Sequence, residues 1–165
     1  MKKSLAILPL LALLVLAGCG KSVSVVEYND SFVAVVKECT ASTQELFNVF
    51  QSEDSTIDFI KEALDNSIAT CKDAETKASK LWDFEKDSSL KDAVVKLLSA
   101  EVDYLQKFWS TSTYRNSDDL TDADKVAYNS VVNELYSSEE ALNSQFVSLP
   151  EVQANFANKY WLKLE

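Results

Sequence analysis

The sequence has 165 residues, a formal net charge of −10 and no histidine. The missing histidine excludes histidine-based zinc sites and Ser-His-Asp or Cys-His catalysis, and the excess of acids argues against a nucleic-acid partner, which needs clustered positive charge. The two glycines and two prolines are too few for the tight turns of a sheet protein, so the composition favours long helices joined by short polar loops.

Residues 1–18 have the pattern of a secretory signal peptide. Lys2 and Lys3 precede an apolar run from Leu5 to Ala17, and this run is shorter than the roughly 20 residues that a permanent transmembrane helix needs. The cysteine directly after Leu-Ala-Gly makes the segment resemble a bacterial lipoprotein signal, the lipobox. The resemblance implies that Cys19 becomes the lipidated first residue of a mature chain, whose net charge is −12 because only two lysines are lost.

Residues 19–24 are expected to form a short lipidated tether that holds a single domain, residues 25–165, close to a membrane. Because the domain is acidic, the lipid rather than the protein surface must hold it on an anionic bilayer. Gly20, rather than aspartate, follows Cys19, which by resemblance to enterobacterial sorting rules favours the outer membrane. No acidic run follows the cysteine, so we expect a lipid-anchored protein of the cell envelope, on the periplasmic face of the outer membrane.

Four helices are predicted in the domain, each with a Ser/Thr-x-x-Asp/Glu capping pattern near its start. Apolar residues recur every seven positions, which is typical of helices that face other helices. The sequence therefore predicts an all-α fold, an antiparallel four-helix bundle in up-down-up-down order plus a C-terminal helical segment. The capping patterns are Ser24…Glu27, Ser55…Asp58, Ser89…Asp92 and Thr121…Asp124. The predicted helices span about Val25 to Gln51, Thr56 to Trp82, Leu90 to Trp109 and Asp122 to Val147. One face of the fourth helix, expected to pack on the bundle, is lined by Tyr128, Val131, Leu135, Leu142 and Phe146.

Two acidic features invite a functional interpretation. Glu101 falls inside the apolar face of the third helix by its spacing, where a buried acid would mark a site, but we expect it to lie at the edge of that face in water. The aspartates between positions 118 and 124 suggest calcium, but the glycine and glutamate that an EF-hand loop requires are missing. Helix capping and a solvated turn explain these aspartates better.

The C-terminal segment follows Pro150, which is expected to kink or restart the fourth helix. Val152, Phe156 and Tyr160 are spaced four apart, so they are expected to pack on the bundle. The alternative is an exposed aromatic patch for a partner. The candidate binding surface then consists of Trp109, Phe156, Tyr160 and Trp161.

The sequence predicts a disulfide between Cys39 and Cys71. Export places both cysteines in an oxidising compartment, and lipid occupies Cys19. If the first two helices form a hairpin that turns near residues 52–55, the two cysteines lie at nearly one height on the core-facing stripe. The alternative is a pair of buried free cysteines that act as small apolar residues.

Several short stretches of the chain carry a family resemblance, and they are Tyr28-Asn29-Asp30, Leu90-Lys91-Asp92-Ala93, Tyr104 and residues 153–159, Gln-Ala-Asn-Phe-Ala-Asn-Lys. Together they look like a family of bacterial helical surface lipoproteins found in leptospires and Bacteroidetes. The resemblance implies a helical bundle with a lipid anchor and supplies no catalytic residue.

Three functions remain open, and the first is favoured because the sequence lacks obvious chemistry. It is a non-enzymatic module that binds another envelope protein, without cofactor, metal or nucleic acid. The second is a carrier for a small apolar ligand in the bundle core, where Trp82, Trp109 and Trp161 would line a pocket. The third is a hydrolase that uses paired carboxylates such as Glu139 and Glu140, a poor pair because adjacent residues on a helix point in different directions.

Overall fold

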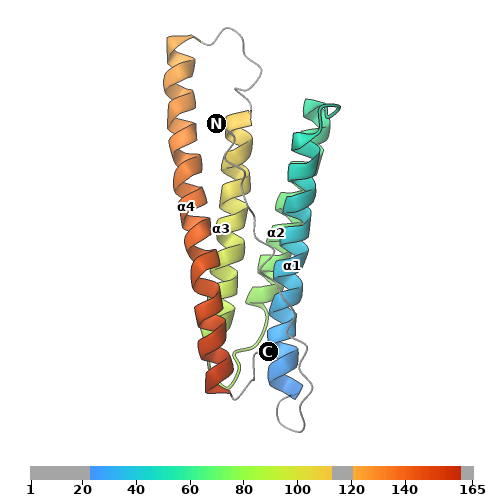
Figure 1. Ribbon diagram of the computed structural model, residues 1–165, viewed down its shortest axis with the longest axis vertical. Coiled ribbons are helices and arrows are strands. Elements are labelled where there is room, and N and C mark those ends of the chain that lie inside the picture. Colours follow the sequence, from blue (N-terminus) through green and yellow to red (C-terminus); the bar gives the residue numbers. More distant parts are fainter. Residues whose placement is uncertain (1–22, 113–120, 161–165) are drawn as a thin grey trace.

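The computed structural model describes residues 23–112 and 121–160, and these form four helices that run alternately up and down (Figure 1). The described residues contain no strand, only an isolated bridge between Phe84 and Asp87. The predicted all-α, antiparallel bundle is therefore confirmed. The helices are α1 (Val23–Gln51), α2 (Ile57–Ser79), α3 (Ser89–Ser112) and α4 (Asp122–Lys159).

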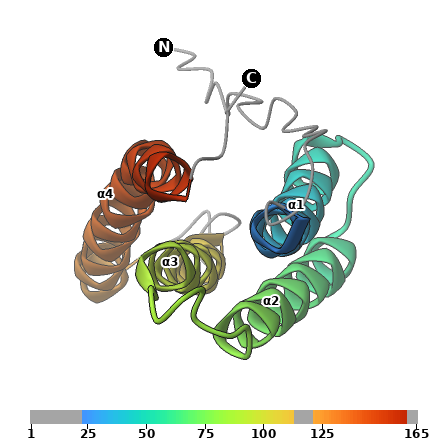
Figure 2. The ribbon, with the colours of Figure 1, turned by 90° about the horizontal axis from the view of Figure 1, so that it is seen from below.

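The four helices form an open row rather than a closed ring. Each helix packs along the next one in sequence, and the backbones of α1 and α4 bring no described Cα atoms within 8 Å of each other. Viewed from one end, the helices follow an arc with α1 and α4 at its two tips (Figure 2). Side chains bridge the tips locally, because Gln153 donates a 2.9 Å hydrogen bond to Asn29 and the rings of Tyr28 and Phe156 lie 5.5 Å apart.

The predicted seven-residue stripe of the first helix is buried as expected. Tyr28, Phe32, Cys39 and Leu46 are all in the core, with Leu64 and Cys71 of α2 and the apolar face of α3. In α4, by contrast, Tyr128 and Phe146 were expected to face the bundle but are exposed. The reason is the open arrangement, since α4 has a neighbour only on the side of α3.

The helix starts follow the capping prediction only in part. Thr121 and Asp124 form the predicted capping box at the start of α4. At α2 the N-cap is Thr56, whose hydroxyl accepts from the Phe59 backbone, rather than Ser55. At α3 the side chain of Asp87 accepts from the backbone N–H of Ser89, so Ser89 is the donor here and not the cap. Ser24 lies inside α1, which begins at Val23.

The fourth helix continues through Pro150 and ends at Lys159, so the predicted stop at Val147 is wrong. The helix absorbs the proline because only one backbone hydrogen bond is lost and packing on α3 stabilises the turns around it. The C-terminal segment is thus the last part of α4. At its other end α4 extends past the other helices (Figure 1), and its buried residues all lie at Ser138 or later.

The second helix ends at Ser79, three residues before the predicted end at Trp82. Trp82 therefore belongs to the connection between α2 and α3. Within the described ranges, no helix is both long and apolar enough to cross a bilayer.

Candidate functional site

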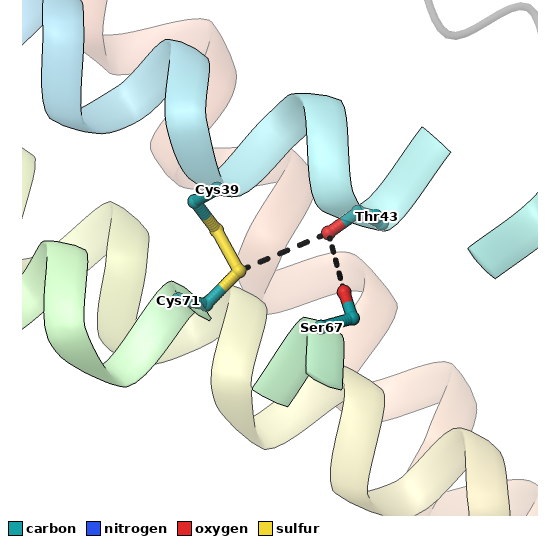
Figure 3. The surroundings of a disulfide bond; sticks show 4 residues. All are labelled: Cys39, Thr43, Ser67 and Cys71. Carbon is teal, nitrogen blue, oxygen red and sulfur yellow. Dashed lines mark hydrogen bonds between the residues drawn. A yellow bond between two sulfur atoms is a disulfide. The ribbon is translucent and has the colours of Figure 1, made fainter. Parts of the chain in front are cut away.

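The structure joins Cys39 of α1 to Cys71 of α2 in a disulfide, as the sequence predicted (Figure 3). The two Cα atoms are 4.6 Å apart, within the range that a disulfide allows. Both cysteines are buried, so the bond links the two helices inside the core and is not exposed to a redox partner. The third cysteine, Cys19, lies outside the described residues.

Next to the disulfide lies a small buried polar cluster. The hydroxyl of Thr43 is 3.5 Å from the hydroxyl of Ser67 and 3.9 Å from the sulfur of Cys71 (Figure 3). Glu101 of α3 is 6% exposed, so the expectation that it lies in water at the edge of the apolar face is wrong. Burial raises the pKa of Glu101, and a hydrogen bond from Thr43 partly offsets this.

Burial of Glu101 follows from the sequential packing of the helices. Because α3 lies between α2 and α4, the edge of its apolar face is covered by neighbours and no water-exposed border remains there. The cluster is closed to solvent, since Thr43, Ser67 and Glu101 are all buried. Its groups therefore have no access to a substrate, and a role in catalysis is not supported.

The described aromatic residues of the C-terminal segment, Phe156 and Tyr160, pack in or against the core. Phe156 is 2% exposed and contacts the rings of Tyr28, Phe84 and Tyr160. The expected packing on the bundle is therefore confirmed for Phe156, and the alternative of an exposed binding surface does not hold for this residue. Tyr160 is half-buried and donates a hydrogen bond of 3.3 Å to the backbone carbonyl of Phe84. Within this cluster burial raises the pKa of Tyr28 to about 12.

The predicted tryptophan pocket does not form. Trp82 precedes α3, whereas Trp109 stands twenty residues after its first residue, which separates them by roughly 30 Å at the rise of an α-helix. Trp109 is partly buried against the core. Trp161 lies outside the described residues. The two described tryptophans thus lie near opposite ends of α3.

The described carboxylates do not gather into a metal site. No group of three or more potential ligands occurs in the described part of the chain. Asp122 pairs with Lys125, and the side chain of Asp124 accepts from the backbone N–H of the N-cap Thr121, which agrees with the capping interpretation of these aspartates. Asp118 and Asp119 lie outside the described residues. Glu139 affects the titration of Tyr104 instead. Burial, together with the negative charges of Glu139 and Glu101, raises the pKa of Tyr104 to about 12.

A hollow of about 140 Å³ lies between α1 and α2, toward the end where these helices turn. Its apolar lining comes from Leu46 and Val49 of α1 and from Ala63 of α2, and Phe59 stands at its border with 54% of its surface exposed. The exposed carboxylates of Glu45 and Glu62 also line it. The polar lining is completed by Ser42 and Asn66.

This hollow was not predicted from the sequence. Its α2 residues are spaced three and four apart, like any helix face, but they mix apolar, acidic and amide side chains, so no periodic pattern marks them. The exposed phenylalanine in the first turn of α2 is the one signal that could have pointed to it. Its size is close to that of an engineered apolar cavity of about 150 Å³ that holds one benzene.

Comparison with known proteins adds no further guide, since no family model, no curated protein and no solved structure matches this chain.

Proposed function

We propose that this chain is a lipid-anchored protein of the cell envelope whose helical bundle binds another envelope protein without catalysis. The signal peptide and lipobox pattern that ends at Cys19 support the anchor. The single observation that carries the binding role is the hollow between α1 and α2, with its exposed Phe59 and its two glutamates.

The chemistry of the hollow indicates what kind of partner fits. Its apolar lining and volume suit one aliphatic or aromatic side chain, the kind of anchor that dominates many protein interfaces. Glu45 and Glu62 beside it favour lysine or arginine next to that anchor. The partner is therefore a protein that presents an apolar side chain within a basic segment.

The position of the hollow also suits this role. It lies near the α1–α2 turn, whereas α1 begins at the opposite end of the bundle, close in sequence to the proposed lipid. A helix of 29 residues is roughly 43 Å long, so the hollow stands clear of the bilayer. The volume gives less support to the carrier hypothesis, because small-molecule pockets usually have about 300–1,000 Å³.

Site-specific photo-cross-linking in intact cells tests the binding role. A photoreactive amino acid placed at Asn66, in the hollow, is expected to cross-link one partner. The same amino acid at Lys72, an exposed position on another face of α2, serves as the matched control. Glu62→Lys in the Asn66 protein is expected to abolish the product, because it reverses the charge next to the basic segment. Equal products from both positions, or a product that Glu62→Lys leaves unchanged, contradict the proposal.

A further inference from the structure

One end of the bundle gathers the start of α1, the α2–α3 connection and the end of α4 (Figure 1). The first described residue, Val23, is four residues after Cys19, and four residues span at most about 14 Å when fully extended. A lipid on Cys19 therefore brings this end, and not the α1–α2 turn, next to the bilayer.

An unusually exposed aromatic residue lies at this end. Trp82 is 57% exposed, and its ring lies 5.6 Å from the ring of Tyr28, which is fully buried in the second turn of α1. Tyr28 is five residues after Val23, or roughly 8 Å along the helix. The indole therefore lies near the point where the tether joins α1. One side of the ring packs against the core, and the other side is exposed.

The connection that carries Trp82 is held in place by many contacts. Phe84 is buried, and its backbone carbonyl accepts hydrogen bonds from the Asp87 backbone and from the Tyr160 hydroxyl. Glu85 and Lys86 between them have positive φ angles of 50° and 69°, a tight turn that costs energy for residues other than glycine. These contacts thus hold the connection that carries Trp82 in one conformation.

Charge differs sharply between the two ends of the molecule. Residues 45–65, around the α1–α2 turn, hold six acids and one lysine. At the end with Trp82 the excess of acids is smaller, and two of the acids there, Asp83 and Asp87, form ion pairs with lysines from α3 and α4. An acidic surface is repelled by an anionic bilayer, so the less acidic end can approach one more closely. Its charged residues are Lys80, Lys86, Lys91 and Lys159 with Glu27, Asp30, Asp83, Glu85, Asp87 and Asp92.

Given the lipid anchor of the proposed function, we propose that this end of the bundle rests on the bilayer with the indole of Trp82 in the headgroup layer. Tryptophan suits this layer because its ring is apolar and its N–H is polar. The contact adds a second attachment to the lipid on Cys19 and sets which end of the domain faces away from the membrane. It leaves the hollow between α1 and α2 open to a protein partner.

Tryptophan fluorescence of the full-length lipidated protein in vesicles tests this contact. Two variants are compared, one that keeps only Trp82 (Trp109→Phe with Trp161→Phe) and one that keeps only Trp109 (Trp82→Phe with Trp161→Phe). The vesicles contain phosphatidylethanolamine and phosphatidylglycerol, with or without bromine on the upper acyl carbons. Bromine is expected to lower the emission of the Trp82-only protein by about half, because an interfacial indole lies close to those carbons. The Trp109-only protein is expected to be unaffected.

Vesicle flotation, run in parallel, tests the lipid anchor separately from the headgroup contact of Trp82. Floated protein whose Trp82 emission is insensitive to bromine overturns the headgroup contact and leaves the lipid anchor intact. Protein that does not float overturns the anchor and, with it, the contact. Equal quenching of both single-tryptophan proteins also overturns the proposal, since it means that no particular end faces the lipid. Circular dichroism of both variants checks that the helical bundle is unchanged.

Discussion

The hydroxyl of Thr43 on α1 interacts with the carboxyl group of Glu101 on α3 and opposes the rise that burial causes in the pKa of that carboxyl. These two helices share little backbone contact, because α2 lies beside both of them. The same hydroxyl faces Ser67 of α2 and the disulfide sulfur of Cys71. A single threonine thus connects three helices beside the buried carboxyl group of Glu101, and the stability of the core depends on the protonation of that carboxyl.

We predict that Glu101→Gln stabilises the protein at neutral pH. Burial raises the pKa of Glu101 above its ordinary value of 4.5, so the folded state binds the proton more tightly than the unfolded state. Stability then falls as the pH rises from about 4.5 through the raised value, because a carboxylate must be buried above it. Glutamine keeps the size and an oxygen acceptor for Thr43. Its advantage over the natural protein is therefore expected at pH 7 and is expected to vanish near pH 4.

Urea unfolding of both proteins across this pH range measures the effect. Glu139→Gln is the control, because it makes the same chemical change at a residue that is only half-buried. A stability difference between Glu101→Gln and the natural protein that is the same at pH 4 and pH 7 would show that Glu101 titrates normally.

We predict that loss of the disulfide destabilises the bundle substantially. The bond closes a loop with a sequence separation of 32, and the chain-entropy model gives about 3–4 kcal/mol for a loop of this size. The pair of substitutions Cys39→Ser and Cys71→Ser is expected to lower the free energy of unfolding by about that amount. Reducing agent should have a similar effect on the natural protein and none on the double variant. Equal stability with and without reductant would indicate that the thiols are not paired.

We predict that Asp87→Asn weakens the link between the α2–α3 connection and the end of α4. Lys159 and Ser89 hold the pKa of Asp87 well below its usual range, so its contribution to stability is present above about pH 4 and is lost as the pH falls below that. Asparagine still accepts from Ser89 but cannot form the ion pair with Lys159. The loss is expected to be small, because Lys159 is exposed and water screens the pair.

A double-mutant cycle with Lys159→Met isolates this ion pair. The coupling between the two substitutions is expected at neutral pH and is expected to disappear in acid. Coupling that stays unchanged even at a pH below the lowered pKa of Asp87 would mean that packing, and not charge, connects the two residues.

We predict that Cys19→Ala abolishes acylation. The leucine-alanine-glycine-cysteine stretch is the basis for this expectation. Metabolic labelling with a radioactive fatty acid should mark the natural protein, and the variant should stay unlabelled, as an uncleaved or released chain. The double variant of Cys39 and Cys71 should still be labelled. Label in the Cys19→Ala protein at the natural level would exclude this cysteine as the lipid site.

We predict that Phe59→Asp removes partner binding without harming the fold. Phe59 is more than half exposed, so its replacement is expected to change the free energy of unfolding by no more than about 0.5 kcal/mol. It also removes apolar surface at the border of the hollow and adds a third acid there. Cross-linking from Asn66 together with thermal unfolding separates these two effects. A variant that unfolds much earlier would mean that Phe59 serves packing instead.

The helices could be predicted well from the sequence because local residue patterns indicate where they form and which of their faces are buried. Cys39 and Cys71 fall on seven-residue stripes, and their nearly equal distances from one turn allow helix geometry to predict that they lie close together. The capping box at Thr121 was equally readable. The predicted helix ends at Trp82 and Val147 were less accurate. Where a helix ends depends on where tertiary packing stops rather than on any local signal.

The nature of the sites was harder to predict than the fold. Whether Glu101 is buried depends on which helices flank α3, and a seven-residue pattern does not state whether four helices close into a ring. The same uncertainty made Tyr128 and Phe146 look like core residues. The hollow arises where side chains of α1 and α2 leave space between them, and such a gap has no counterpart in the sequence of either helix.

The unequal lengths of α3 and α4 divide the last helix into two regions with different local stability. The 38 residues of α4 outnumber the 24 of α3, and before Ser138 none is buried. These first turns have little tertiary packing, so they can open without disturbing the core. Their backbone amides are expected to exchange with deuterium quickly, while those near Leu142 and Phe156 exchange only when the whole bundle unfolds. The fourth helix is thus one continuous helix, but its first turns and its later turns are expected to unfold separately.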